Sequence, residues 1–304
     1  MTAATIRLGT RGSPLALVQA RLTRDAFCAA HNWPPERVEI VPVMTAGDRI
    51  QDRPLAEIGG KALWTKALDS ALFSGEIDFA VHSLKDVETL RPAGITIAAM
   101  LKRADVRDRL IGAPSIASLK HGARVGTSSP RRGAQLLRLR PDLVVSPIRG
   151  NVATRLAKLA AGEVDATLLA AAGLDRLGQP DVGVAITVDQ MLPAASQGAI
   201  GVECRTEDAA MRALFEAIDC KSTRAAVCAE RDLLAELSAD CHSPVGAFAE
   251  VRDGILILTA ELLTEDGRLY VRDEIAINGP DSAALLARRL LDDAPSELRA
   301  LFGK

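Results

Sequence analysis

The sequence predicts an α/β protein with two units built on parallel sheets, followed by a smaller α+β domain. Through the first two thirds of the chain, short apolar runs of strand length alternate with segments of helical periodicity, which is typical of parallel sheets. The alternation starts afresh after a charged run at 102–109, which we interpret as a crossing between domains. In the last third, two Asp-Gly pairs mark tight hairpin turns.

The first unit begins with a strand expected at 5–10. Ser13 is then a suitable N-cap, and Pro14 suits the first turn of a helix. A second strand at 38–44 leads into a long polar stretch, 45–60, which we interpret as a mobile lid or a covered loop. The elements that follow are a helix at 61–73, a buried strand that starts at 79, and a strand at 96–100.

The second unit repeats this alternation. Its expected elements are strands at 123–125, 143–145 and 166–170, with helices at 130–140 and up to 161. A strand at 199–204 is expected to return to the first unit. The C-terminal third then contains a helix at 223–237, a loop at 238–244, the hairpin-rich segment and a last helix from 281.

Lys85 and Asp86 follow the strand that starts at 79. In open parallel sheets, ligands bind at the carboxyl ends of the strands. A carboxylate beside an ammonium group at that end is therefore a candidate site. The alternative is a surface ion pair in an ordinary loop.

Arginines recur where strands of the second unit lead into helices. Arg131 and Arg132 open a helix, where cations oppose the helix dipole, so we expect them to serve something anionic. Ser128, Ser129 and the free amides of the helix start favour the same kind of ligand. The set is completed by Arg149, Arg155 and Arg176. The alternative is a solvated basic face, and our inference is a polycarboxylate or phosphate ligand.

Composition excludes several classes of function. The formal net charge is −2 and aromatic residues make up 3% of the chain, so nucleic-acid binding is not expected. No dinucleotide fingerprint or complete P-loop is present, and the histidines and cysteines lack metal-site spacing. With no leader and no membrane-spanning run, we expect a cytoplasmic protein. Cys241 differs from the other cysteines because it lies in a loop, where its thiol can reach a ligand.

Motifs along nearly the whole chain resemble those of the porphobilinogen deaminase family, also called hydroxymethylbilane synthases. They occur in family order and spacing at 7–17, 58–61, 81–87, 125–132, 149–156, 172–178 and 197–205. The chain departs from the family pattern at Ala239, Asp240 and His242 around the expected cofactor cysteine, at Trp64 and at Glu88.

The resemblance implies three domains and a covalent cofactor. Two domains would be like those of type II periplasmic binding proteins, the first formed by 1–101 with 200–219 and the second by 106–195. The third, 220–304, would carry a dipyrromethane cofactor as a thioether on Cys241. Family enzymes join four porphobilinogen units head to tail on this primer, release ammonia at each step and hydrolyse off the linear tetrapyrrole. The resemblance also implies a monomer.

Roles for individual residues follow from the resemblance. Asp86 would stabilise the cation left when ammonia departs and move protons, with Lys85 beside it. The cofactor would be held by Lys85, Ser128, Ser129, Arg131, Arg132 and Arg155. The substrate would be bound by Arg11, Ser13, Lys61, Trp64, Thr127, Arg149, Gly150, Arg155, Arg176 and Gln197. The alternative function is a carboxylate-binding receptor or sensor domain that performs no chemistry.

Overall fold

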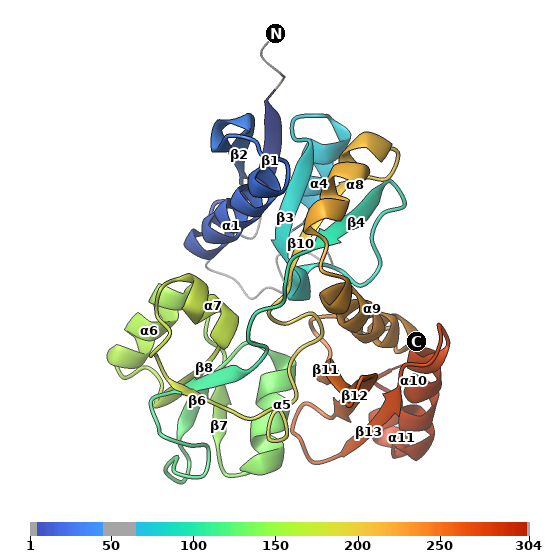
Figure 1. The fold of residues 1–304 in the computed structure, drawn as a ribbon. Helices are drawn as coiled ribbons and strands as arrows, with labels where there is room; N and C mark the ends of the chain where they lie inside the picture. Colours follow the sequence, from blue (N-terminus) through green and yellow to red (C-terminus); the bar gives the residue numbers. More distant parts are fainter. Residues whose placement is uncertain (1–4, 45–64, 303–304) are drawn as a thin grey trace. The chain divides into compact units, whose positions relative to one another are not determined.

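The computed structural model describes residues 5–44 and 65–302 (Figure 1). The chain divides into two compact units, one formed by Met1–Ala104 and Gly198–Arg224 and the other by Asp105–Gln197 and Ala225–Lys304. The expected lid at 45–60, and the predicted site residues Lys61 and Trp64, lie outside the described residues.

The first unit contains a five-stranded sheet in the order β2-β1-β3-β10-β4. Its strands are β1 (Ile6–Arg11), β2 (Val38–Val43), β3 (Phe79–Ser83), β4 (Ile95–Met100) and β10 (Ile200–Arg205). β1 runs parallel to β2 and β3, whereas β10 runs antiparallel to both of its neighbours. The expected return of the chain to the first unit at 199–204 is thus confirmed.

The second unit contains a sheet with the same plan, in the order β7-β6-β8-β5-β9. Its strands are β5 (Asp108–Ile111), β6 (Arg124–Gly126), β7 (Val144–Ser146), β8 (Ala166–Ala170) and β9 (Val184–Ala185). Here β5 is the antiparallel strand. β5 and β10 each come directly after a crossing between the units, and each takes the position before the last strand of its sheet.

Helices cover both faces of the first sheet. α1 (Pro14–Ala30) begins as expected, because the Ser13 side chain accepts a hydrogen bond from the Ala16 amide. Short 3₁₀ turns follow at η1 (Pro35–Arg37), η2 (Leu84–Asp86) and η3 (Glu216–Ile218). The side chains of α1 and of Phe215, at the end of α8 (Ala209–Phe215), pack with Leu8 and Phe79 in one core cluster. α4 (Lys66–Phe73) covers the other face, where Leu68 contacts a second cluster around Ala80.

The second sheet is flanked by α5 (Pro130–Leu139), α6 (Val152–Ala160) and α7 (Ala171–Arg176). Ser129 caps α5 by accepting a hydrogen bond from the Arg132 amide, and Asn151 caps α6 in the same way through Thr154. Each of these caps ends a loop that leaves the carboxyl end of a parallel strand. The predicted anion-binding loops are therefore at the starts of helices.

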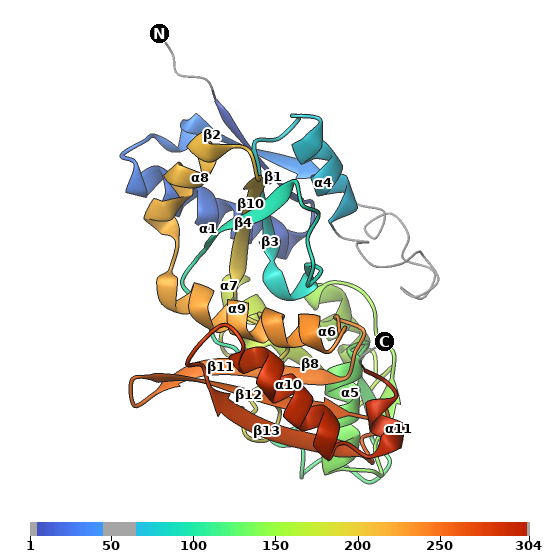
Figure 2. The ribbon, with the colours of Figure 1, turned by 90° about the vertical axis from the view of Figure 1, so that its right-hand side faces the viewer.

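The C-terminal part is an antiparallel sheet in the order β11-β12-β13, packed against helices. Its elements are α9 (Lys221–Glu236), β11 (Val245–Arg252), β12 (Ile255–Leu263), β13 (Tyr270–Ala276), α10 (Ser282–Asp293) and α11 (Ser296–Arg299). Figure 2 shows α10 lying across the strands, and its Leu286 and Leu290 share a buried cluster with Leu258 and with Leu233 of α9. The expected α/β class with a smaller α+β part is confirmed.

Three expectations need correction. Between β11 and β12 the expected tight turn is present, since Asp253 and Gly254 both have positive φ. Between β12 and β13, however, only Gly267 does, and the connection spans 264–269, so it is a longer loop. The sheets are not wholly parallel, because β5 and β10 run the other way. The helix expected from 61 begins at Lys66, with 61–64 outside the described residues.

Candidate active site

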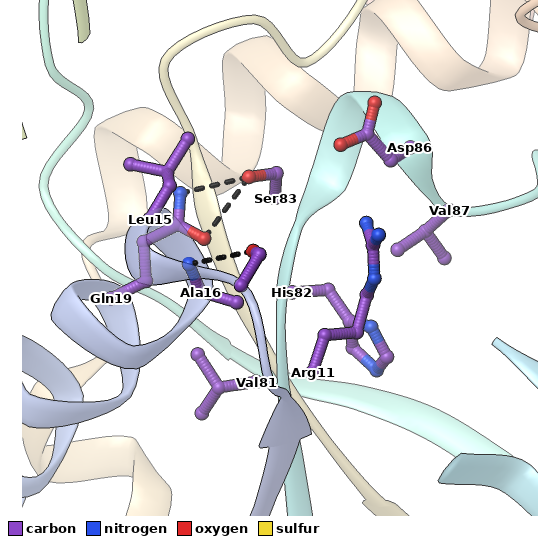
Figure 3. Close-up of a pocket in the computed structure, with 10 residues that line it drawn as sticks. Arg11, Leu15, Ala16, Gln19, Val81, His82, Ser83, Asp86 and Val87 are labelled. Carbon is purple, nitrogen blue, oxygen red and sulfur yellow. Dashed lines mark hydrogen bonds between the residues drawn. The ribbon is translucent and has the colours of Figure 1, made fainter. Parts of the chain in front are cut away.

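A small cavity of about 60 Å³ opens at the carboxyl ends of β1 and β3. Arg11, the last residue of β1, and Ser83, the last of β3, both line it, together with Ser13, His82 and Asp86 (Figure 3). This is the edge at which parallel sheets bind ligands. The structure therefore brings three of the predicted site residues, Arg11, Ser13 and Asp86, to one place in the first unit.

Asp86 ends the η2 turn, and its side chain is exposed. Its carboxylate makes no hydrogen bond or ion pair with any residue in the described part of the chain. The turn itself is held firmly, because Leu84 is fully buried. In Figure 3 the Arg11 side chain extends from β1 toward the turn that carries Asp86 and Val87. Within the described residues, Asp86 thus presents an exposed carboxylate at the end of a turn that is anchored by Leu84.

A polar pair braces the wall of this cavity. The Gln19 amide donates a hydrogen bond of 2.8 Å to Ser83 Oγ, and Ser83 Oγ lies 3.1 Å from Gln19 Oε1. Gln19 is buried in α1, so the pair links the helix to the end of β3 (Figure 3). Sequence analysis missed Gln19. Its signal was a polar residue on the buried face of an amphipathic helix.

His82 connects the cavity to a buried cluster of charges beneath it. Its Nε2 lies 3.1 Å from Glu203 Oε2, in β10. The Arg91 guanidinium contacts Glu203 at 2.8 Å, Glu88 at 2.7 Å and Asp69 at 2.5 Å. We call these five residues the Arg91 cluster. It joins α4, β3, β10 and the segment after Asp86, and it was not anticipated from the sequence.

Electrostatics hold Glu203 in its ionised form. Burial by itself would raise the pKa of this carboxyl group, but His82 and Arg91 outweigh burial and lower the pKa to about 2. For Asp69, burial outweighs Arg91 and the pKa is raised. The cluster therefore contains three carboxyl groups, Asp69, Glu88 and Glu203, that share the single guanidinium of Arg91.

In the second unit, Arg131 and Arg132 are buried and share one carboxylate. Asp108 Oδ2 accepts from Arg131 Nη2 at 2.8 Å, and Asp108 Oδ1 accepts from Arg132 Nη2 at 2.6 Å. Gln197 donates to the same Oδ1 at 2.9 Å. The structure thus brings three predicted site residues together around a carboxylate that sequence analysis did not single out, because Asp108 lies in the charged run taken for a crossing.

Among the predicted site residues, two arginines have a buried side-chain nitrogen without a hydrogen-bond partner in the described structure. Arg149 Nη1 and Arg131 Nε are buried and have no hydrogen-bond partner in the described parts of the chain. A buried donor without a partner is costly, so both nitrogens favour an incoming acceptor. Burial also lowers the pKa of Arg176, to about 10, although neighbouring Asp175 opposes this shift. Arg155 lies in the same region as Arg149, with its Nε bonded to the Gly150 carbonyl at 3.0 Å.

The three hydroxyl residues before α5 already have structural partners. Ser128 Oγ exchanges hydrogen bonds with the Ile148 carbonyl, at 2.8 Å, and the Ile148 amide, at 3.1 Å. Ser129 Oγ caps α5, and Thr127 Oγ1 accepts from the Ser129 amide at 3.2 Å. These bonds fix the shape of the loop from which a ligand would be bound.

Cys241 is exposed and is not part of a disulfide. It lies in a turn after α9 that is closed by local hydrogen bonds: the Asp240 carboxylate accepts from the His242 amide at 2.8 Å, and Ser243 Oγ accepts from the Asp240 amide at 3.1 Å. Cys28 and Cys204 are buried, as expected of packing residues. Within the described residues, no group of histidine, cysteine or acidic side chains is arranged to hold a metal ion, and no helix is long and apolar enough to cross a membrane.

Comparison with known proteins gives a consistent result. A family model described as "Porphobilinogen deaminase, dipyromethane cofactor binding domain" matches residues 6–213, and one described as "Porphobilinogen deaminase, C-terminal domain" matches 224–294. A porphobilinogen deaminase from Sphingopyxis alaskensis is 58% identical over 98% of this chain and 96% of its own length. One from Paracoccus denitrificans is 47% identical over 96% and 95% of the two chains.

Several solved structures of binding proteins are similar to this chain at low sequence identity. A nutrient binding protein from Burkholderia cenocepacia, bound to methionine, is 15% identical with a TM-score of 0.43, over 73% of this chain and 94% of that one. A similarity at this level carries no argument about function.

Proposed function

The chain belongs to the porphobilinogen deaminase family and is a hydroxymethylbilane synthase with a dipyrromethane cofactor, and we propose how its residues divide the work. The enzyme condenses four porphobilinogen molecules head to tail, with release of ammonia, and hydrolyses off hydroxymethylbilane. Family membership supports this activity and gives no support to a receptor or sensor.

We assign attachment of the cofactor to Cys241. Its thiol is exposed on a turn fixed by local hydrogen bonds, so a thioether can form there without unfolding the domain. The residues of the second unit also fit the group, since its carboxylates match the buried donors of Arg149 and Arg131 that lack partners. When bound, the dipyrromethane supplies the primer onto which porphobilinogen units are joined.

The arginines hold carboxylates. Each porphobilinogen carries an acetate and a propionate, so every addition brings two further negative charges to the enzyme. Arg131, Arg132 and Arg155, with Lys85, Ser128 and Ser129, hold the cofactor in this proposal. The substrate and the growing chain are bound by Arg11, Ser13, Lys61, Trp64, Thr127, Arg149, Gly150, Arg155, Arg176 and Gln197. Planar guanidinium groups suit this task because they bind carboxylates through two parallel hydrogen bonds.

Asp86 is the catalytic carboxylate, and its lack of a partner in the described structure is the observation that carries this assignment. Loss of ammonia leaves a cation whose charge is shared by the pyrrole nitrogen. A carboxylate that accepts a hydrogen bond from that N–H binds the cation more strongly than the neutral ring, which stabilises the transition state. Asp86 can also move the protons that ammonia release and rearomatisation require. Lys85 assists by binding a ligand carboxylate and keeping negative charge on Asp86.

The test of Asp86 is the variant Asp86→Asn, which keeps the size of the side chain and removes its charge. We expect the variant to bind porphobilinogen and to lose more than about tenfold in kcat, equivalent to roughly 1.4 kcal/mol of barrier. Steady-state kinetics and substrate binding are measured on the same preparation. A kcat within about tenfold of the wild type would remove Asp86 from the chemistry.

The test of Cys241 is intact-protein mass spectrometry. The wild-type chain should carry the added mass of a dipyrrole, and Cys241→Ser should not. Cys220→Ser is the matched control, because Cys220 is also partly accessible but is placed at the start of α9. An added mass that persists in Cys241→Ser would move the attachment site elsewhere.

We further propose the division into domains at 1–101 with 200–219, 106–195 and 220–304, a monomeric state and a cytoplasmic location. These rest on the family resemblance and on the scattered cysteines of the sequence. Light scattering of the purified, cofactor-loaded protein tests the monomer, and a mass of twice 32.2 kDa would contradict it.

A further inference from the structure

Asp108 occupies an unusual position for a buried acid. It is the first residue of β5, directly after the chain enters the second unit, and it is 1% exposed. Its carboxylate accepts hydrogen bonds from three side chains, those of Arg131, Arg132 and Gln197. None of these contacts belongs to the known chemistry of the reaction, yet all three partners are proposed ligand-binding residues.

The charges of this group do not balance. Two buried guanidinium groups bind one carboxylate directly. The other buried acid nearby, Glu261, is paired with Arg138 at 3.2 Å, so one net positive charge remains in a place with little water. Burial lowers the pKa of Arg131, and the adjacent Arg132 acts in the same direction, whereas Asp108 and, after it, Glu261 oppose the shift. Without Asp108, the two cations would repel each other at short range in a low dielectric. With Asp108, the surplus of one positive charge suits a single incoming carboxylate.

The geometry around Asp108 also fixes where the arginines point. Arg132 is held from two sides, because Nε and Nη2 donate to Asp108 while Nη1 donates to the Leu168 carbonyl at 3.0 Å. Arg131 is held by Asp108 through Nη2 and by the Leu192 carbonyl and Gln135 through Nη1. Its Nε remains without a partner in the described chain. Side chains held in this way lose little conformational entropy when a ligand binds.

Gln197 ties the same carboxylate to the second crossing. Its Nε2 donates both to Asp108 and to the Val106 carbonyl, at 2.7 Å. Val106 precedes Asp108 just after the first crossing, and Gln197 is the last residue before the second. The Asp108 carboxylate therefore contacts both the arginine pair and Gln197, the residue that links the two ends of the segment 105–197.

We propose that Asp108 is a positioning residue for ligand binding: it aligns Arg131 and Arg132, cancels their mutual repulsion, and leaves one net positive charge for a carboxylate of the cofactor or the growing chain. This inference rests on the proposed role of the two arginines. Asp108 itself touches no ligand. It acts through the arginines, so its removal should weaken binding more than it slows the chemical steps.

The variant Asp108→Asn tests this, because an amide cannot accept from both guanidinium groups and turns an N–H toward one of them. Protein made without porphobilinogen is incubated with porphobilinogen, and covalent loading is followed by intact mass. We expect loading to slow about tenfold or more, and KM to rise about tenfold with a smaller change in kcat. Asp108→Glu, which restores the charge, should recover part of the loading rate, and it also serves if Asp108→Asn does not fold.

Asp219→Asn is the matched control. The Asp219 side chain is likewise shielded, at 2% exposure, and binds an arginine, Arg224, at 2.8 Å. It lies in the other unit and contacts none of the Asp108 partners. The Asp219→Asn variant should lower thermal stability about as much as Asp108→Asn does, without changing the rate of cofactor loading or KM.

The outcomes separate this inference from the proposed function. If Arg131→Gln and Arg132→Gln fail to load while Asp108→Asn loads and binds within about twofold of the wild type, the arginines are ligands and the inference about Asp108 is wrong. If both arginine variants load normally, the proposed role of the arginines is wrong, and the inference falls with it. If Asp108→Asn and Asp219→Asn slow covalent loading and raise KM to the same extent, Asp108 has only a structural role.

Discussion

At the scale of single residues, the first unit depends on one buried cation. The Arg91 side chain is 8% exposed and binds Asp69, Glu88 and Glu203. Buried ion pairs add little net stability when they form, but removing one partner is strongly unfavourable because the remaining charges stay buried. Glu88 also accepts from the Thr65 hydroxyl at 2.7 Å, which connects the cluster to the start of α4.

Replacing Arg91 should therefore cost far more than replacing an exposed arginine. For Arg91→Met we expect the free energy of unfolding to fall by about 3–5 kcal/mol, since three carboxylates lose their shared partner. Urea denaturation at neutral pH measures this. Arg24→Met, which removes a surface pair with the adjacent Asp25, is the control and should cost at most about 1 kcal/mol. Similar losses for the two variants would show that the cluster is solvated in solution.

Glu203 should make the enzyme sensitive to acid. Its pKa falls from an ordinary value of 4.5 to about 2 in the folded protein, so the unfolded chain binds its proton first as the pH drops. The stability that Glu203 contributes is present above pH 4.5 and is lost as the pH falls toward 2. The midpoint of thermal unfolding should thus decline less steeply over this range in Glu203→Gln than in the wild type. Parallel curves would contradict the assignment.

Sequence patterns singled out candidate residues by their place after a strand, at the start of a helix or in a loop. They missed charged residues whose importance depends on being buried. Asp86 and Arg131 are recognisable because each follows a strand or opens a helix, and Cys241 because it lies in a loop. Arg91, Asp108 and Glu203 were missed because a single sequence does not show that a charged side chain is buried. Their partners are up to 121 positions away in the sequence, the separation between His82 and Glu203, and only the folded chain brings them together.

At the scale of elements, the position of the Asp86 turn depends on contact with β10. Gly201 of β10 pairs with His82 of β3, and its missing side chain leaves space for Leu84. A Cβ at Gly201 would lie 2.2 Å from Leu84 Cδ2 and 2.6 Å from Leu84 Cγ. Since Leu84 begins the turn that ends with Asp86, β10, the strand that returns from the second unit, determines the position of that turn.

Gly201→Ala should therefore move the turn. We expect kcat to fall by about tenfold, because a shift of about 1 Å in a catalytic group is enough for a large loss. Combining it with Leu84→Ala should recover part of the activity, which a double-mutant cycle in kcat would measure. Gly279→Ala, where a Cβ meets nothing within 4 Å, is the control and should keep full activity. Additive losses in the double variant would argue against contact between Gly201 and Leu84.

Most elements were predictable where local and tertiary preferences agree. β8 at Ala166–Ala170 was predicted with its exact ends, because every residue of the strand except Thr167 is apolar and the segments on either side are helical. β5 was missed because its sequence, Asp-Arg-Leu-Ile, looks like the end of a charged linker. The Asp108 and Arg109 side chains are compatible with a central strand only because distant residues pair with them.

At the scale of the whole molecule, the net charge of −2 conceals the local electrostatics that matter. The surplus positive charge lies around Asp108 and Arg149 in the second unit, and the surplus negative charge lies in the Arg91 cluster of the first. The composition predicts no general affinity for nucleic acid. The positions of the arginines indicated that cations gather locally, as Arg131 and Arg132 do around Asp108. Only the structure shows which buried acids pair with these arginines.

This distribution predicts that cofactor loading stabilises the protein. The cofactor carboxylates find partners for guanidinium groups that are buried and incompletely bonded, and these contacts exist only in the folded state. The loaded wild type should therefore melt at least about 4 °C above the unloaded Cys241→Ser, equivalent to about 1–2 kcal/mol in a chain of this size. Loaded Cys220→Ser, which keeps the attachment residue, should melt with the wild type. If loaded and unloaded proteins melt together, the arginines do not bind the cofactor, even if Cys241 carries it.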